Sequence, residues 1–145
     1  GQLTTFDEPN CDPRGPTLSI AMWAVVRKFP VPTDSATRWS EFAAPAHLAF
    51  DHDRIVAKAI ERLRGKATYS SLPVFLLPAT FTMNELHRIY EQTIGVRLDK
   101  ASFRHKILEQ GIIDPVPSQF RMGAHRPAQL YRLANRVLTA FERKI

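Results

Sequence analysis

The chain has 145 residues, 44% hydrophobic content and a net charge of +6, a composition typical of a folded protein with one or two small domains. It has no apolar run of the roughly 18 residues that a membrane-spanning helix needs, no basic segment followed by an apolar core at its start, and a single cysteine. We therefore expect no membrane partner, no secretory signal and no disulfide framework, in a protein of the reducing cytoplasm.

The positive charge is concentrated in the second part of the chain. Residues 1–66 contain 9 basic and 8 acidic side chains, whereas residues 67–145 contain 11 and 6. The boundary is drawn beside Gly65, because glycine commonly ends a helix. The excess of basic residues favours a polyanionic partner for the second part.

The first part has the pattern of an incomplete α/β unit. Residues 8–16 hold three prolines and a glycine, which predicts a turn-rich loop. Residues 17–26 form a continuous apolar run, the pattern of a strand buried on both faces, and residues 39–42 are a candidate second strand. Asp51 is positioned to cap a helix that Gly65 would end.

These elements are too few for an independent domain. A strand buried on both faces needs neighbours along both edges and cover on both sides. One or two strands and one helix cannot supply them within about 66 residues, a size already marginal for a separate core. Either another chain completes this region or it belongs to a larger domain that starts upstream, and we favour the second interpretation.

The second part begins with a helix-turn-helix pattern. Residues 67–78 predict a short apolar helix. Thr82 and Glu85 have the spacing of a capping box, and Gly95 suits the C-terminal turn of the helix that they open. Another helix follows directly, and two helices joined by a short glycine-containing turn are a helix-turn-helix candidate.

The second of these helices begins at Asp99, ends at Gly111 and has an unusual distribution of charge. Phe103, Ile107 and Leu108 form its apolar side, and no acidic residue lies between its cap and its last turn. Such a helix can enter the DNA major groove, where outward side chains reach base edges and basic flanks reach phosphates. The candidate DNA contacts on it are Lys100, Ser102, Arg104, His105 and Lys106.

Two strand-like runs, residues 112–117 and 128–133, follow this helix. The segment between them is a flexible basic loop, and we expect Arg121 and Arg126 on it to contact the DNA backbone or minor groove. Three helices followed by a hairpin with a basic tip are the element order of a winged helix. Residues 134–145 predict a closing amphipathic helix.

The basic helix and the hairpin also have an explanation that involves no DNA. A basic helical face is usually only solvated surface, and winged helices also serve as protein-contact modules. The coincidence of the helix-turn-helix, the acid-free face and the basic wing favours DNA binding.

Four stretches of the chain resemble a known family: LAFDHDRI (48–55), FLLPATFTMNELHRIYEQTIG (75–95), LDKASFRHKILEQG (98–111) and QLTTFDEPNCDPRG (2–15), the last being similar to the loop that follows the Nudix helix. They are similar to the Nudix-related transcriptional regulators of NAD metabolism and to the ADP-ribose pyrophosphatase-like proteins that share their architecture. The resemblance implies an α+β chain. Residues 1–66 would be the C-terminal half of a Nudix α/β sandwich, and residues 67–145 a winged helix-turn-helix domain.

The resemblance also implies a function. The expected protein is a repressor of NAD-biosynthesis genes that binds palindromic double-stranded DNA as a homodimer and, when intact, responds to ADP-ribose or a related nucleotide. The alternative is a fragment of a Nudix ADP-ribose pyrophosphatase whose winged helix serves dimerisation or regulation.

Catalysis is not expected of this chain. Nudix hydrolases hold their divalent ions with a carboxylate cluster that includes a Glu-Glu pair, and the chain has no such pair, so we expect no hydrolysis, no metal site and no cofactor. The family's loop usually reads Arg-Asp-Pro-Arg, whereas Cys11 stands at its first position here. Arg14 in this loop is the candidate contact for a ligand phosphate.

Overall fold

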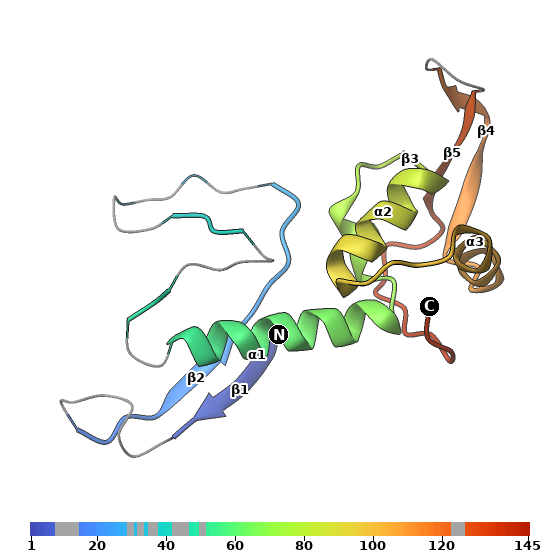
Figure 1. The fold of residues 1–145 in the computed structure, drawn as a ribbon. Helices are drawn as coiled ribbons and strands as arrows, with labels where there is room; N and C mark the ends of the chain where they lie inside the picture. The colour runs from blue at the N-terminus through green and yellow to red at the C-terminus, as the bar shows by residue number, and fades with distance from the viewer. Residues whose placement is uncertain are drawn as a thin grey trace. The chain divides into compact units, whose positions relative to one another are not determined.

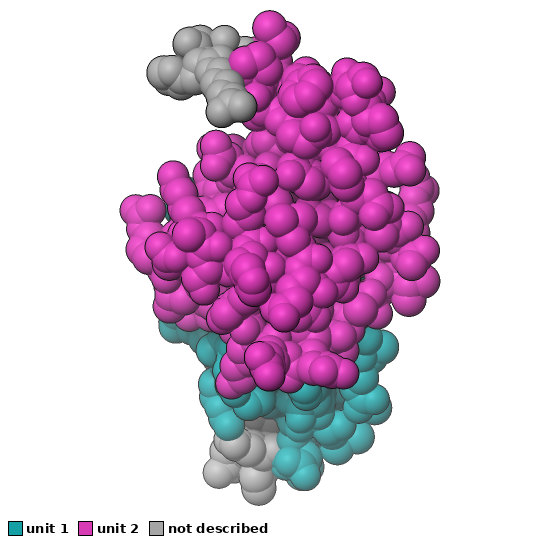
Figure 2. Space-filling view, turned by 90° about the vertical axis from the view of Figure 1, so that its right-hand side faces the viewer, with its two compact units in different colours: residues 1–63 teal, residues 64–145 magenta. Residues whose placement is uncertain are grey.

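The structure is a computed structural model, shown in Figure 1, that describes residues 1–7, 15–28, 31, 34, 38–41, 47–49, 52–122 and 127–145. The chain divides into two compact units, Gly1–Leu63 and Arg64–Ile145, which Figure 2 colours separately. The division falls inside helix α1 (His52–Thr68), within one helical turn of the boundary predicted after Lys66. The assignment of residues 1–66 to half of a Nudix domain and of residues 67–145 to a winged-helix domain remains a prediction.

Unit 1 contains a two-stranded antiparallel sheet in which β1 (Gln2–Phe6) pairs with β2 (Ser19–Met22). The resemblance had indicated a loop for residues 2–15, and this was wrong for the five residues of β1. Residues 39–41 form no strand, and Phe42 lies outside the described residues, as do Asp51 and most of the loop predicted at residues 8–16.

The prediction that β2 is buried on both faces was also wrong. Ile20 and Met22 are 60% and 69% exposed, and the strand is shorter than the apolar run that predicted it. An apolar run shows that a strand can be buried, but burial itself requires covering elements. In the described part of unit 1, β1 is the strand that pairs with β2.

Helix α1 continues through Gly65, where the sequence had indicated its end, and stops at Thr68. Glycine within a helix costs only about 1 kcal/mol relative to alanine, so a helix can continue through it. The hydroxyl of Thr68 donates to the carbonyl of Gly65 at 2.7 Å, and that of Ser70 donates to the carbonyl of Lys66 at 2.6 Å. These bonds satisfy two carbonyl groups of the last turn.

Unit 2 is built from three helical segments and a three-stranded sheet. The 3-10 helix η1 (Leu72–Leu76) replaces the longer helix predicted at residues 67–78, whose first two residues belong to α1. The other elements are β3 (Phe81–Thr82), α2 (Met83–Ile94), α3 (Lys100–Glu109), β4 (Ile113–Arg121) and β5 (Ala128–Leu133). The strand order is β3-β5-β4 with antiparallel pairing, the arrangement expected of a winged helix.

The start and end of α2 are those that the sequence predicted. The Thr82 hydroxyl accepts from the backbone N–H of Glu85 at 3.2 Å, and the Glu85 carboxylate accepts from the backbone N–H of Thr82 at 2.8 Å. The helix ends at Gly95, whose φ of 86° lies in the left-handed region that favours glycine. Both the capping box and the glycine stop are confirmed.

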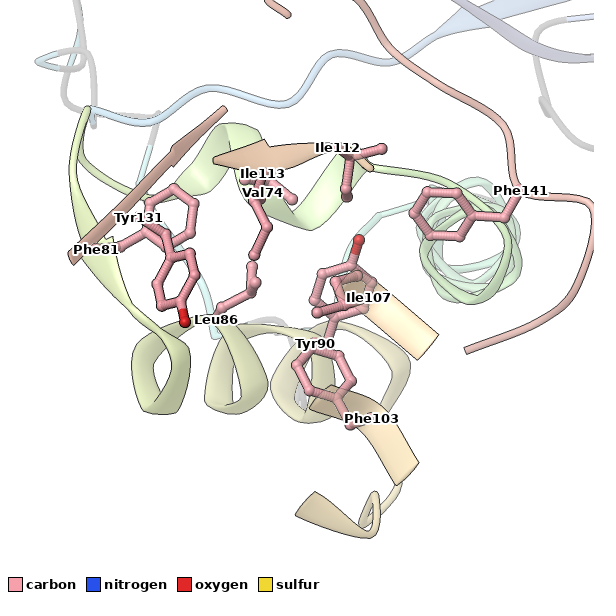
Figure 3. Close-up of a cluster of buried hydrophobic side chains, with 10 residues drawn as sticks. All are labelled: Val74, Phe81, Leu86, Tyr90, Phe103, Ile107, Ile112, Ile113, Tyr131 and Phe141. Carbon is pink, nitrogen blue, oxygen red and sulfur yellow. The ribbon is translucent and has the colours of Figure 1, made fainter. Parts of the chain in front are cut away.

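The core of unit 2 joins residues from every part of it, as Figure 3 shows. Phe103 and Ile107 of α3 pack beside Tyr90 of α2, and the Tyr90 hydroxyl donates to the buried carbonyl of Ser70 at 3.0 Å. The cluster comprises Val74, Phe81, Leu86, Tyr90, Phe103, Ile107, Ile112, Ile113, Tyr131 and Phe141. Leu108, predicted on the buried side of α3, is 41% exposed.

The C-terminal segment, residues 134–145, forms no helix, contrary to the sequence prediction. Its backbone bonds to other parts of unit 2 instead. The N–H of Ser71 donates to the carbonyl of Thr139 at 2.9 Å, and the N–H of Thr139 donates to the hydroxyl of Ser71 at 2.9 Å. The apolar side of the predicted amphipathic helix would have contained Val137, Leu138 and Phe141, but Val137 and Leu138 are exposed and only Phe141 of these three is buried. Tertiary hydrogen bonds therefore outweigh the helical periodicity here.

Candidate nucleic-acid interface

Helix α3 is the centre of the candidate interface, and local contacts account for its position. The Asp99 carboxylate accepts from the backbone N–H of Ser102 at 2.8 Å, which confirms the predicted cap. Phe103 and Ile107 anchor one side of the helix in the core of unit 2. The opposite side faces solvent.

The outward side of α3 carries the predicted residues. Lys100, Ser102, Arg104 and His105 are all exposed. The His105 side chain is 79% exposed, with Nδ1 at 3.9 Å from the carboxylate of Glu109 at the end of the helix. Before that residue the exposed surface of α3 has no acidic group, so it can approach a polyanion without repulsion.

Lys106 behaves differently from its neighbours on α3. It is half-buried, and its ammonium donates to the backbone carbonyl of Lys144 at 3.1 Å. Around this contact a cavity of about 360 Å³ opens between α3 and the C-terminal segment, lined on one side by Ser102 and His105 and on the other by Arg143 and Lys144. Arg143 and Lys144 were not among the predicted site residues, because the pattern of their segment predicts an amphipathic helix that packs on the core.

The turn that joins α2 to α3 is held by two side chains of α2. Nε2 of His87 lies 2.9 Å from the carbonyl of Leu98, and because a carbonyl only accepts, this nitrogen carries a proton. The Glu91 carboxylate accepts from the N–H of Leu98 at 2.9 Å with one oxygen and lies 3.6 Å from Nδ1 of His87 with the other. Both side chains are largely buried, and the His87 ring meets Phe103 edge-on at 5.1 Å. The residue that precedes the Asp99 cap is thus fixed through both of its backbone polar groups.

This pair was not predicted from the sequence. The sequence feature that could have indicated the pair is its spacing, because His87 and Glu91 are four residues apart on α2 and therefore share one face of the helix. The helical periodicity of the sequence predicts a buried stripe of Leu86, Ile89, Tyr90 and Ile94 on α2. Ile89 and Ile94 are only half-buried, whereas His87 and Thr93 are buried.

The hairpin of β4 and β5 extends beyond α3 as the predicted wing (Figure 1). Arg121 is the last residue of β4, so its assignment to a flexible loop was wrong. Its guanidinium pairs with the carboxylate of Glu85 at the start of α2. The hairpin bends at Ser118, the one described non-glycine residue with a positive φ, where the pairing with β5 shifts register. Arg126 lies outside the described residues.

The ion pair between Arg121 and Glu85 affects an acidic group that already caps a helix. Burial raises the pKa of Glu85, but the hydrogen bonds from the N–H and hydroxyl of Thr82 and from Arg121 outweigh it and leave the pKa below its usual value. Glu85 is therefore charged at neutral pH and links Arg121, at the loop end of β4, to the start of α2.

The candidate for the ligand phosphate, Arg14, lies outside the described residues. Among the residues that the structure describes, no three His, Cys, Asp or Glu side chains are grouped so that they could hold a metal ion. None of the helices in the described ranges combines the length and apolar character of a membrane span.

Comparison with known proteins shows which proteins the chain is similar to. Residues 73–133 match the NrtR DNA-binding winged helix domain. The ADPR responsive transcriptional repressor NtrR of Acinetobacter baylyi is 33% identical over an alignment of 139 residues, and the match covers 92% of this chain and 55% of that protein. The chain therefore spans about half the length of this curated relative.

Solved structures show the same relationship. The crystal structure of Shewanella oneidensis NrtR superposes with a TM-score of 0.79 at 29% identity and covers 100% of this chain and 69% of that chain. NrtR of the same organism complexed with a 27mer DNA superposes with a TM-score of 0.73 at 26% identity, over 99% of this chain and 68% of that chain.

A MutT/nudix family protein from Enterococcus faecalis superposes with a TM-score of 0.59 at 22% identity, over 93% of this chain and 61% of that chain, and at this identity it shows the fold alone. The predicted fold class, an α+β chain with a Nudix-related part and a winged helix, is confirmed. Residues 73–133 match the NrtR DNA-binding winged helix domain, and the chain as a whole is homologous to the repressor NtrR and similar in structure to the Nudix-related regulator NrtR.

Proposed function

We propose that this chain is the DNA-binding part of a transcriptional repressor. The observation that carries the proposal is α3, a helix whose exposed face has no acidic group before Glu109 in its last turn and that stands beside a projecting hairpin. The description of the Acinetobacter baylyi relative as a repressor and the DNA complex of the Shewanella oneidensis protein support the same conclusion.

In the proposed complex α3 enters the major groove. Ser102 and His105, near the middle of the helix, reach base edges, whereas Lys100 and Arg104 neutralise phosphates and set the register. Lys106 contributes less directly, because its ammonium already binds the carbonyl of Lys144.

The wing supports the helix. Arg126, on the connection between β4 and β5, contacts the backbone or the minor groove. Arg121 ties the loop end of β4 to the start of α2 through its ion pair with Glu85. DNA contact by Arg121 would require this pair to open or to share its guanidinium.

For the intact protein we propose a cytoplasmic homodimer that represses NAD-biosynthesis genes. Two copies of α3 related by two-fold symmetry would bind a palindromic operator. An ADP-ribose-like nucleotide would be the effector, as the description of the Acinetobacter baylyi relative suggests, and Arg14 would contact one of its phosphates.

Hydrolysis is not part of this proposal, because the sequence has no Glu-Glu pair to hold divalent ions. The pyrophosphatase alternative is tested directly by incubation of the chain with ADP-ribose and magnesium or manganese. Release of AMP above a control without protein would support the alternative and contradict the proposal.

Titration of the purified chain against duplex DNA at several salt concentrations tests DNA binding itself. Each phosphate that a basic side chain neutralises contributes about −0.9 to the slope of log affinity against log salt concentration. We expect clear binding at about 50 mM salt and a marked loss by about 200 mM. Absence of binding at the lower salt, or affinity that does not change between the two, would refute the proposal.

A test of whether α3 or the wing reads the DNA sequence requires a specific operator. Such an operator can be selected from a pool of random duplexes by binding to the chain itself. His105→Ala should reduce the preference for this operator over random DNA by about 1–3 kcal/mol. Arg126→Ala should weaken both DNAs alike and lower the salt slope by about one unit. If a folded His105→Ala variant keeps its full preference while Arg126→Ala loses it, the wing and not α3 reads the sequence.

A further inference from the structure

The C-terminal segment, residues 134–145, is fixed in place although it has no regular secondary structure. Phe141 is 7% exposed and belongs to the core of unit 2. Its backbone N–H donates to the carbonyl of Tyr69 at 2.7 Å, and the N–H of Ile145 donates to the carbonyl of Thr68 at 2.9 Å. Arg143 and Lys144 lie between these two anchors, so their backbone is held on both sides.

This segment reaches the outward side of α3. The bond from the Lys106 ammonium to the Lys144 carbonyl joins it to the helix. The cavity of about 360 Å³ beside this bond is open to solvent on the same side as Ser102 and His105, and Arg143 and Lys144 line it from the segment. Two exposed cations thus stand next to the surface that is proposed to enter the DNA groove.

The charges around the cavity suit a polyanion. Lys106, Arg143 and Lys144 are positive, and Glu109 is the acidic residue among the residues that line it. Glu142 also lies on the segment and is exposed. The cations outnumber the one lining carboxylate, so the local field attracts phosphate.

The C-terminal segment and the wing lie on different flanks of α3. The hairpin of β4 and β5 rises on one side of α3, and the end of the chain lies on the other (Figure 1). A helix in the major groove has a phosphate backbone along each of its flanks. The wing can contact the phosphate backbone on one flank of α3, but contact with the backbone on the other flank requires basic residues from a different element.

We propose that the C-terminal segment is a second phosphate-contact element, in which Arg143 and Lys144 bind the DNA backbone on the flank of α3 away from the wing. Lys106 acts there as a positioning residue, since its bond to the Lys144 carbonyl sets the distance between segment and helix. The inference rests on the proposed function, because it requires α3 to lie in the major groove.

The test compares two double variants that remove equal charge. Arg143→Gln/Lys144→Gln neutralises the segment, whereas Lys58→Gln/Arg62→Gln neutralises two exposed side chains of α1 in unit 1. Fluorescence anisotropy measures the affinity of each for a mixed-sequence duplex of 27 base pairs, the length in the Shewanella oneidensis complex, across a salt series. We expect the segment variant to bind roughly tenfold more weakly near 100 mM salt and to have a salt slope smaller by about two units.

The variant in α1 should keep the wild-type salt slope. Equal slopes for the segment variant and the wild type would overturn the inference, as would equal losses in both variants, which would indicate an effect of net charge alone. Tighter binding by the segment variant would overturn it as well, because it would mean that the segment shields α3. If the wild type binds no duplex at all, the proposed function fails and the inference with it. Circular dichroism of each variant verifies that the helices are retained.

Discussion

Replacing Glu91 with alanine tests how the turn between α2 and α3 holds the DNA-binding helix in position. One carboxylate oxygen of Glu91 accepts from the N–H of Leu98 at 2.9 Å. The other lies 3.6 Å from Nδ1 of His87 and 4.0 Å from the guanidinium of Arg97. The alanine variant removes all three interactions and leaves the N–H of Leu98 without this acceptor.

The size of the effect follows from the burial of each partner. The Glu91 side chain is only 16% exposed, so its hydrogen bond to Leu98 should approach the roughly 1.5–3 kcal/mol of bonds to charged groups. Arg97 is almost fully exposed, and an exposed pair contributes at most about 1 kcal/mol. We expect Glu91→Ala to lower the free energy of unfolding of unit 2 by about 2–3 kcal/mol.

Two variants serve as controls. Glu91→Gln keeps an oxygen that can accept from Leu98, and a neutral bond retains about 0.5–1.5 kcal/mol, so this variant should recover much of the loss. Glu109→Ala removes an exposed carboxylate that lies 3.9 Å from Nδ1 of His105. Such an exposed pair is worth about 0.5 kcal/mol or less.

Urea denaturation followed by far-ultraviolet circular dichroism measures these differences. Both tryptophans, Trp23 and Trp39, belong to unit 1, so their fluorescence reports separately on that unit. A change of less than about 0.5 kcal/mol in Glu91→Ala would show that Leu98 finds another partner at no cost. A Glu91→Gln variant as unstable as Glu91→Ala would show that charge, and not the hydrogen bond, holds the turn.

Three further substitutions test individual contacts. The pKa of Glu85 is depressed in the folded state, so its contribution to stability is present above the unfolded pKa of about 4.5 and is lost as the pH falls below that value. The urea midpoint of Glu85→Gln should therefore differ less between about pH 6 and about pH 3 than the midpoint of the wild type does. An equal difference in both proteins would count against this role of Glu85. Tyr90→Phe deprives the buried carbonyl of Ser70 of its 3.0 Å hydrogen bond and should lower the midpoint by the equivalent of about 1–3 kcal/mol, whereas a thermal melt identical to wild type would mean that water replaces the hydroxyl. Asp99→Ala removes the cap on Ser102 and should cost about 1 kcal/mol, with Asp99→Asn close to wild type; equal losses in both would contradict the capping role.

Contacts between near neighbours in the chain were predictable from the sequence. The capping box of Thr82 and Glu85, the cap at Asp99 and the left-handed stop at Gly95 all depend on residues within four positions of one another. Backbone geometry limits such groups to a few arrangements, so residue type and spacing are sufficient to identify them. The burial of Phe103 was predictable for the same reason, from helical periodicity.

Contacts between distant residues were decided by the tertiary structure. The segment after residue 133 has a helical pattern, yet its backbone pairs with residues 68–71 because Phe141 is buried in the core. Lys106 looked like a free basic side chain until the fold brought it to the carbonyl of Lys144, 38 residues away. No pattern in the sequence connected His87 with Leu98, whose carbonyl lies 2.9 Å from its ring nitrogen in the fold. Periodicity gives the side of a helix on which a residue lies, but only the packed chain determines which partner meets that side, because the partner comes from another element whose position depends on the whole core.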